Sequence, residues 1–196
     1  MGALLFGKRP PKLVDRRRYP SLKKSLKKLD LAKEQLADVL GAPESAFSVE
    51  LCEGENASIN RGGRIAFGLE LLGLHRKDDD LLVAVLAHEI GHQPWTWPDD
   101  DLSRLTKAQL DALYREEEAK ADRFAGRALA DLGLDPDAIC EFLLAAESFE
   151  AHKPSDYYPA ETRAKMIRDA FGRRRRMLEN AAKLNPQALA RSRELR

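Results

Sequence analysis

One segment of the chain, Leu81–His92 (LLVAVLAHEIGH), is apolar around nearly its whole circumference as a helix, yet it contains three ionisable residues. A helix that is apolar on all sides is buried in the core of a protein. Asp78–Asp80 precede the segment and suit the start of a helix, and Pro94 closes it. The sequence therefore predicts a central buried helix, whose ionisable residues cost several kcal/mol to bury unless they are paired or coordinated.

These ionisable residues are His88, Glu89 and His92, in the spacing His-Glu-x-x-His. Positions i and i+4 project from the same face of a helix one turn apart, so both imidazoles can bind one metal ion. Glu89 is rotated to the side, where it can take a proton from a metal-activated water. A chance match is the alternative, but the chain has only 4 histidines and two of them fall in this window. The segment therefore predicts a metal site.

A zinc ion held by two histidines still needs a third protein ligand. The positions of His75 and His152 do not argue for either of them. Glu118 and Asp122 share one face of a predicted helix, so one carboxylate can bind the metal while the other accepts the outer N–H of a ligating histidine. Periodicity alone does not select Glu118, because Glu117 lies nearer the centre of the apolar stripe and adjacent glutamates are also typical of a solvated helix face.

The remaining apolar patterns set the fold class. Helical spacing predicts further helices over residues 21–40, 107–131, 136–146 and 159–184. Alternation of apolar residues predicts strands over residues 47–51 and 65–71. We therefore expect an α+β fold: a mainly helical single domain with a small mixed β-sheet.

The N-terminal segment differs in character from the rest. Residues 1–20 are basic and contain Pro10, Pro11 and Pro20, which predicts an extended leader ahead of a folded domain over residues 21–196. Residues 8–28 carry ten Lys or Arg against one acid, Asp15, and a second basic cluster lies at Arg173–Arg176. Solvated helix faces explain such clusters, and weak contact of the basic termini with nucleic acid or anionic lipid is the alternative.

Composition excludes several classes of protein. With 43% hydrophobic and 33% charged residues, the chain is too apolar to be disordered and too charged to be embedded in a membrane. No apolar run approaches the roughly 20 residues that span a bilayer, and Ala3–Phe6 is too short for the core of a signal peptide. Cys52 and Cys140 lie far apart and predict neither a disulfide framework nor a cysteine zinc site. We expect a cytoplasmic protein in a reducing compartment.

The His-Glu-x-x-His segment is followed by Glu-x-x-Ala-Asp at residues 118–122. In this order the two motifs resemble the gluzincin metallopeptidases, specifically the CAAX prenyl protease and heat-shock peptidase family with its small soluble relatives, the minigluzincins. Residues 55–57 (Glu-Asn-Ala) and 62–65 (Gly-Gly-Arg-Ile) resemble the family's substrate-side strand and second strand. Pro159, Glu161 and Arg163 resemble its closing His-Pro-Pro-x-x-x-Arg segment. The resemblance covers about residues 45–175 and implies a zincin-like peptidase fold.

This resemblance implies a role for each matching residue. His88, His92 and Glu118 would be the zinc ligands, and Glu89 the general base and acid. Asp122 would support a ligating histidine from behind. Asn56 and Ala57, on a sheet edge above the site, would hold the substrate as an added strand.

The chain departs from the family pattern at Tyr157, where the family has a histidine six residues before the arginine that Arg163 matches. A phenol can donate a hydrogen bond to a tetrahedral oxyanion as an imidazole can. Tyr157, with Arg163 in support, is therefore the candidate for stabilising the transition state, and its neighbour Tyr158 competes for that role. The family's membrane-spanning helices are missing, so nothing implies a prenylated or membrane-embedded substrate.

Two functions follow. The first is a zinc-dependent endopeptidase, in which Glu89 takes a proton from a zinc-activated water and passes it to the leaving amine. The second is a non-catalytic zinc-containing binding protein on a metalloprotease fold, whose basic termini contact nucleic acid or membrane. Glu89 argues against the second, because a purely structural zinc site has no use for a general base.

Three further residues have less specific interpretations. We interpret Trp95 and Trp97 as residues that pack a loop, and the alternative is that their indoles line a substrate pocket. We interpret His152 as a surface histidine.

Overall fold

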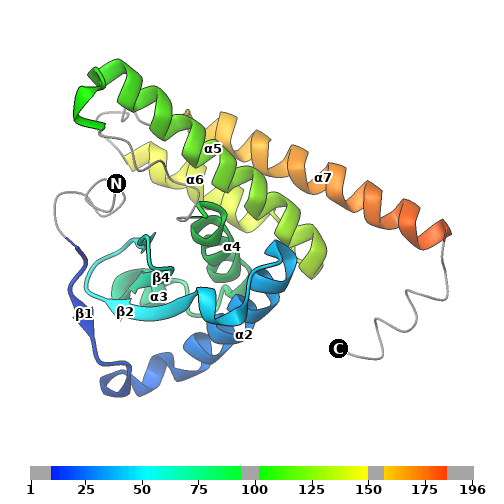
Figure 1. Cartoon of the computed structure of the whole chain (residues 1–196). Coiled ribbons are helices and arrows are strands. Elements are labelled where there is room, and N and C mark those ends of the chain that lie inside the picture. Colours follow the sequence, from blue (N-terminus) through cyan, green and yellow to red (C-terminus); the bar gives the residue numbers. More distant parts are fainter. Residues whose placement is uncertain (1–9, 94–101, 150–156, 185–196) are drawn as a thin grey trace.

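Helix α4 (Asp79–Gly91) is the centre of the computed structural model, which describes residues 10–93, 102–149 and 157–184. Every residue of the helix from Leu81 onward is buried. The Asp78 side chain caps the helix by accepting a hydrogen bond from the Leu81 N–H at 3.1 Å, as the acidic run predicted. Helix α4 packs against α2, α5, α6 and strand β3, so it lies between a layer of helices and the sheet (Figure 1).

Four other helices lie close to where their apolar patterns predicted them: α2 (Lys23–Leu40), α5 (Lys107–Leu132), α6 (Asp137–Phe149) and α7 (Ala160–Leu184). A short helix that the sequence did not predict, α3 (Leu69–Leu74), follows strand β4. Gly41 and Gly133 are the C-terminal caps of α2 and α5. The expected α+β class, mainly helical with a small sheet, is confirmed.

Four strands form a mixed sheet in the order β1-β2-β4-β3: β1 (Leu13–Val14), β2 (Ser48–Cys52), β3 (Ala57–Ile59) and β4 (Arg64–Gly68). Strand β2 runs parallel to β4, with Val49 opposite Ile65, and the other two pairs are antiparallel. This order leaves β3 at one edge of the sheet, on the side that packs against α4.

The strand predicted over residues 65–71 is wrong at its end, because β4 stops at Gly68 and residues 69–74 form helix α3. A Cβ on Gly68 would lie 2.1 Å from the carbonyl oxygen of Gly54, so the two backbones touch where the strand finishes. Leu71 and Leu72 are buried by the helix. Apolar residues at this spacing fit either a strand or a short helix, and the backbone contact at Gly68 coincides with the change.

Residues 10–22 lie against the domain rather than apart from it. Strand β1 pairs with β2, and the Arg16 guanidinium donates to the Asp30 carboxylate of α2 at 2.6 Å. Leu22 is buried in the hydrophobic core. The division of the chain at residue 20 stays a prediction.

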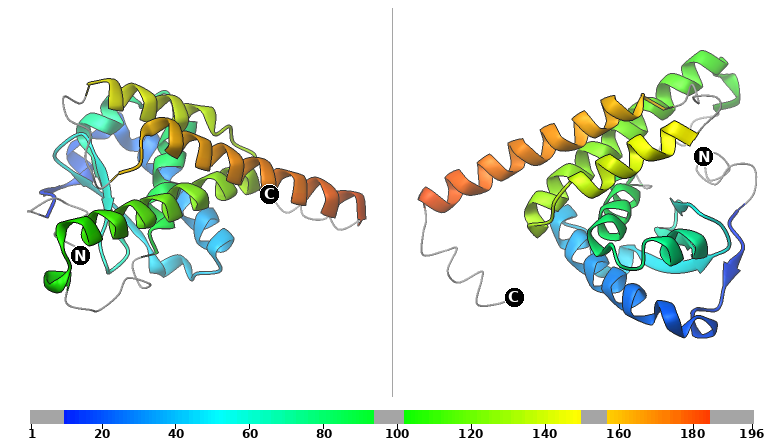
Figure 2. Two further views of the ribbon diagram at one scale, coloured as in Figure 1. Left: turned by 90° about the horizontal axis from the view of Figure 1, so that it is seen from above. Right: turned by 180° about the vertical axis from the view of Figure 1, so that it is seen from behind.

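Helices α5, α6 and α7 form one layer over α4 (Figure 2). Arg163 bonds Asp122 and Arg174 bonds Asp131, so α7 runs in the same direction as α5. Helix α6 runs in the opposite direction, because its start lies near Arg168 and its end near Ala160. Beyond Arg174, α7 continues past the end of α5 and projects from the body (Figure 2).

The two cysteines, Cys52 and Cys140, are both buried, and neither forms a disulfide bond.

Gly91 sets the distance between α4 and α5. A Cβ at this position would lie 2.9 Å from both the Cα and the carbonyl oxygen of Ala121. These are backbone atoms of α5, which cannot move aside as a flexible side chain can. Glycine at residue 91 therefore allows the two helices to approach more closely than alanine would.

We predict that Gly91→Ala lowers the free energy of unfolding by about 1–3 kcal/mol, the usual cost of overpacking. Gly73→Ala is the matched control, because a Cβ at Gly73 of α3 meets nothing within 4 Å. The control should be neutral or slightly stabilising, since alanine favours helix more than glycine does. Urea unfolding followed by circular dichroism measures both variants. Equal stability of the two variants would contradict the close contact between α4 and α5.

Candidate metal centre

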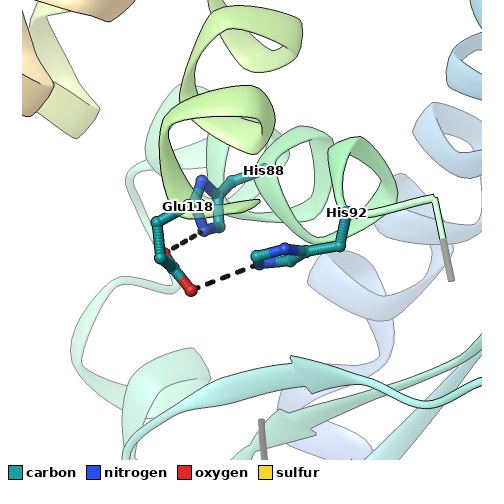
Figure 3. A group of neighbouring side chains, drawn as sticks. All are labelled: His88, His92 and Glu118. Carbon is teal, nitrogen blue, oxygen red and sulfur yellow. Dashed lines mark ion pairs between the residues drawn. The ribbon is translucent and has the colours of Figure 1, made fainter. Parts of the chain in front are cut away.

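Helices α4 and α5 bring three metal-ligating side chains together. The His88 Nε2 lies 3.2 Å from one carboxylate oxygen of Glu118, and the His92 Nε2 lies 3.6 Å from the other (Figure 3). The two imidazole rings meet edge to face, with their centroids 4.9 Å apart. All three side chains are buried. The two histidines lie on one face of α4, and the close approach of α5 at Gly91 brings Glu118 next to them.

These residues fit a metal ion by the chemistry of their donors. One ligand atom from each of His88, His92 and Glu118 lies within 4.8 Å of the others. Two imidazole nitrogens and one carboxylate oxygen are a common set of protein ligands in catalytic zinc sites. Such sites keep a further coordination position open for water or substrate. Burying these ionisable groups is costly without mutual pairing or a cation. The described residues therefore contain a candidate metal centre.

The three adjacent glutamates of α5 have different partners. Only Glu118 points at the histidines. Glu116 accepts a hydrogen bond from the Tyr158 hydroxyl at 2.7 Å, and Glu117 lies 3.6 Å from the Lys120 ammonium. The glutamate at the edge of the apolar stripe, rather than the one nearer its centre, is thus the one beside the histidines.

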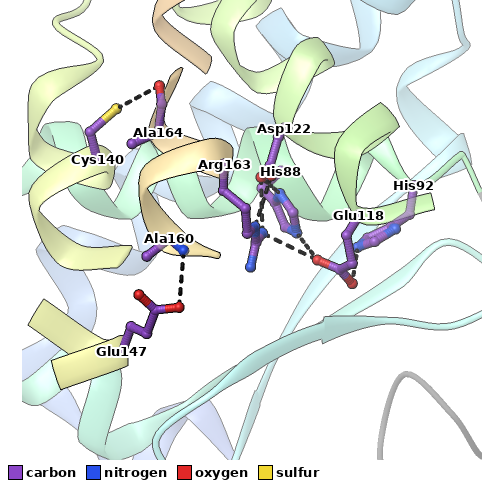
Figure 4. Close-up of polar contacts among 9 residues, drawn as sticks. All are labelled: His88, His92, Glu118, Asp122, Cys140, Glu147, Ala160, Arg163 and Ala164. Carbon is purple, nitrogen blue, oxygen red and sulfur yellow. Dashed lines mark hydrogen bonds and ion pairs between the residues drawn. The ribbon is translucent and has the colours of Figure 1, made fainter. Parts of the chain in front are cut away.

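A second set of charged groups lies behind the candidate ligands (Figure 4). The His88 Nδ1 is 3.0 Å from an oxygen of Asp122, which is fully buried. Arg163 of α7 donates to both Asp122 oxygens, at 2.8 and 2.9 Å, and to Glu118 at 3.2 Å. Such contacts fix the ring orientation of a ligating histidine and the position of a ligating carboxylate. Arg163 therefore holds two acidic side chains of α5 in place.

Burial and these contacts shift the pKa values of the buried groups. Burial alone raises the pKa of Asp122, but its hydrogen bonds with His88 and Arg163 outweigh burial and lower that pKa to about 2. Burial alone lowers the pKa of His88, but hydrogen bonds with Asp122 and Glu118 raise it overall. For His92, burial and repulsion by His88 lower the pKa to about 4. Asp122 is thus held as a carboxylate next to His88.

Glu89 is buried beside the candidate ligands. It is neither one of these ligands nor one of the charged groups behind them. Burial raises the pKa of its carboxyl to about 7, although the charge of His88 and a backbone hydrogen bond with Ile59 of β3 favour the ionised form. Glu89 also lines the cavity that contains His88 and His92. A carboxyl with a pKa near neutrality can both accept and release a proton at physiological pH.

A cavity opens beside the three candidate ligands, and its lining contains two different surfaces. One is formed by Asn56 and Ala57, at the start of edge strand β3. The second surface is apolar and comes chiefly from α6: Leu71, Val85, Ile139, Phe142 and Leu143. We call this second surface the apolar wall. It was not predicted from the sequence, although the helical pattern over residues 136–146 placed apolar residues there.

The structure also separates the two candidate tyrosines. Tyr157 lines the cavity, with the guanidinium carbon of Arg163 5.4 Å from its ring centre. Tyr158 is turned to Glu116, on the exposed side of α5. Of the two, only Tyr157 lines the cavity that contains the candidate ligands.

The remaining predicted residues lie elsewhere. His75 packs edge-on against the Phe142 ring, with centroids 5.5 Å apart, and is not in the cluster of candidate ligands. Trp95, Trp97 and His152 lie outside the described residues.

Within the described ranges, none of the helices combines the length and apolar composition that crossing a bilayer requires.

The chain was compared with known proteins in three ways. Searches of curated proteins and of solved structures returned no match. Residues 24–95, which include His88, Glu89 and His92 and end before Glu118, match the model of peptidase family M48, so this part of the chain is similar to a family of metallopeptidases.

Proposed function

We propose that the protein is a zinc-dependent endopeptidase of the minigluzincin-like type. One observation carries the proposal: Glu89 lies in the same cavity as His88, His92 and Glu118, beside an edge strand. The match of residues 24–95 to peptidase family M48 supports it independently. A bound zinc ion, held by His88, His92 and Glu118, would supply Lewis-acid activation of water and of the peptide carbonyl.

Glu89 would move the proton. Its carboxylate takes a proton from the attacking water and delivers it to the nitrogen of the leaving amine, which a group of pKa about 7 can do in both directions. The backbone hydrogen bond with Ile59 fixes Glu89 next to β3. This contact supports the proposal, because it keeps Glu89 beside the strand that would hold the substrate.

Strand β3 would bind the substrate backbone. The Asn56 carbonyl accepts from the Gly68 N–H and the Asn60 N–H donates to the Arg64 carbonyl, so these residues pair with β4. Hydrogen-bonding direction alternates along a strand, which turns the backbone groups of Ala57 and Ile59 to the free edge. Ile59 uses that edge to contact Glu89. Ala57 would pair with an extended substrate as an added strand.

The apolar wall would accept an apolar substrate side chain. Its residues line the same cavity as Asn56 and Ala57, so we expect a substrate paired to β3 to place a side chain near Phe142 and Leu143. Backbone pairing is weakly selective for sequence, whereas removing apolar surface from water contributes about 25 cal/mol per Å². We therefore infer that the apolar wall, rather than β3, determines which peptides are preferred.

Glu89→Gln tests the proposal against the non-catalytic alternative. We expect the variant to bind zinc as the wild type does and to lose about 10²–10⁴-fold in kcat/KM on casein or a mixed peptide library. Glu117→Gln is the matched control, because Glu117 is on α5 and pairs with Lys120 instead of the candidate ligands. Hydrolysis by Glu89→Gln at the wild-type rate, or zinc-loaded wild-type protein without any hydrolysis, would overturn the peptidase proposal.

Tyr157→Phe tests the tyrosine in the cavity. If Tyr157 donates a hydrogen bond to the transition-state oxyanion, the variant should lower kcat about a hundredfold, with KM and zinc content little changed. Tyr158→Phe removes the same hydroxyl from the neighbouring residue and should leave kcat nearly unchanged, because that hydroxyl bonds Glu116. Normal kcat per bound zinc in Tyr157→Phe, with reduced stability, would instead show that Tyr157 is structural.

A further inference from the structure

The helical layer has a second concave surface, away from the metal centre. It is a groove between the end of α2 and helices α5 and α7, lined by Val39, Phe124, Arg127, Arg173, Arg174 and Met177 among others. Arg127 follows Glu118 by nine residues, which places the two on opposite faces of α5. The groove is therefore not part of the candidate active site, and we call it the α5/α7 groove.

Positive charge gathers along this groove without matching negative charge. Arg174 is paired, because its guanidinium donates to the Asp131 carboxylate at 2.9 Å. Within the part of the chain that the structure describes, neither Arg127 nor Arg173 forms an ion pair; Arg127 lies over the Phe124 ring, 5.9 Å from its centre. Burial, followed by repulsion from Arg123, Arg174 and Arg173, lowers the pKa of Arg127. A bound anion would relieve this repulsion.

Apolar side chains supply about half of the lining of the groove. Met177 is 61% exposed and Val39 is 37% exposed, which leaves much of both side chains in contact with water. The buried Phe124 forms part of the lining beneath them. The surface thus offers an apolar strip bordered by arginines.

The arginines and the apolar strip of the groove together favour one class of negatively charged partner over others. Single-stranded nucleic acid binds through aromatic side chains on which bases stack, whereas the one aromatic ring of this lining, Phe124, is buried. A membrane surface is flat, whereas this surface is concave and contains the carboxylate of Asp131. A peptide with acidic residues around an apolar one matches both the arginines and the apolar strip. We propose that the α5/α7 groove binds an acidic segment of a partner protein that carries an apolar side chain.

A labelled peptide tests the inference. The probe is a fluorescein-labelled synthetic peptide that repeats Glu-Glu-Leu, titrated with the full chain and followed by anisotropy. We expect Arg127→Gln with Arg173→Gln to weaken binding at least about tenfold, the equivalent of about 1.4 kcal/mol. Met177→Gln should weaken it as well, because the apolar strip contributes.

The matched control is Arg168→Gln with Arg175→Gln. It removes the same charge from exposed residues that pair with Asp137 and Glu179, outside the lining of the groove. This control should bind the peptide as the wild type does. Equal weakening in the control, or no binding by a wild-type protein that unfolds normally, would overturn the inference.

Two further probes separate the other partners. A single-stranded oligonucleotide and phosphatidylserine vesicles are titrated under the same conditions and should bind more weakly than the peptide. Tighter binding of either, with loss in the Arg127→Gln and Arg173→Gln variant, would overturn the peptide assignment. Repeating the peptide titration in the Glu89→Gln background removes any effect of cleavage, and that variant should bind the peptide normally whether or not the protein is a peptidase.

Discussion

The pairing of buried charges between α4, α5 and α7 is the interaction on which the rest of the structure depends. Helix α4 is apolar enough to lie at the centre, yet it carries His88, Glu89 and His92 into the core. The carboxylates of Glu118 and Asp122 on α5 lie against the two histidines, and the guanidinium of Arg163 compensates these carboxylates in turn. Because an unpaired buried charge costs several kcal/mol, the three helices can pack in this arrangement only when the charges meet.

The same packing explains how the candidate site is open on one side. Helices α5 and α7 cover the histidines from behind through Asp122 and Arg163, whereas residues of α6 and residues at the start of β3 line the cavity. A rigid, paired side holds the candidate ligands, and the open side presents a strand edge and the apolar wall. Peptide hydrolysis needs both, because the reacting groups must be fixed while an extended chain enters.

Sequence patterns predicted the long elements and the central pair of histidines well. Helices α2, α4, α5, α6 and α7 have clear apolar periodicity and recognisable caps, so local sequence determines them. Strand β1 has two residues and β3 has three, too short for alternation to be detected, and both exist through pairing with neighbours. The end of β4 at Gly68 depends on contact with Gly54, which is tertiary information.

In the candidate site, too, some features can be predicted from local sequence and others depend on tertiary packing. The spacing of His88, Glu89 and His92 on one helix is visible in the sequence, whereas the choice of Glu118 over Glu117 depends on how α5 is rotated against α4. Resemblance to a known family indicated Glu118, and the packing at Gly91 gives the physical reason. The apolar wall lies on a different helix from the histidines, so no local pattern connects the two.

Zinc content measured by elemental analysis tests the central claim most directly, on the purified wild type beside Glu118→Ala and Glu117→Ala. Our account predicts about one zinc ion per chain in the wild type and in Glu117→Ala, and clearly lower occupancy and affinity in Glu118→Ala. Unchanged occupancy and affinity in Glu118→Ala would contradict it, because the carboxylate beside His88 and His92 would then not be a ligand.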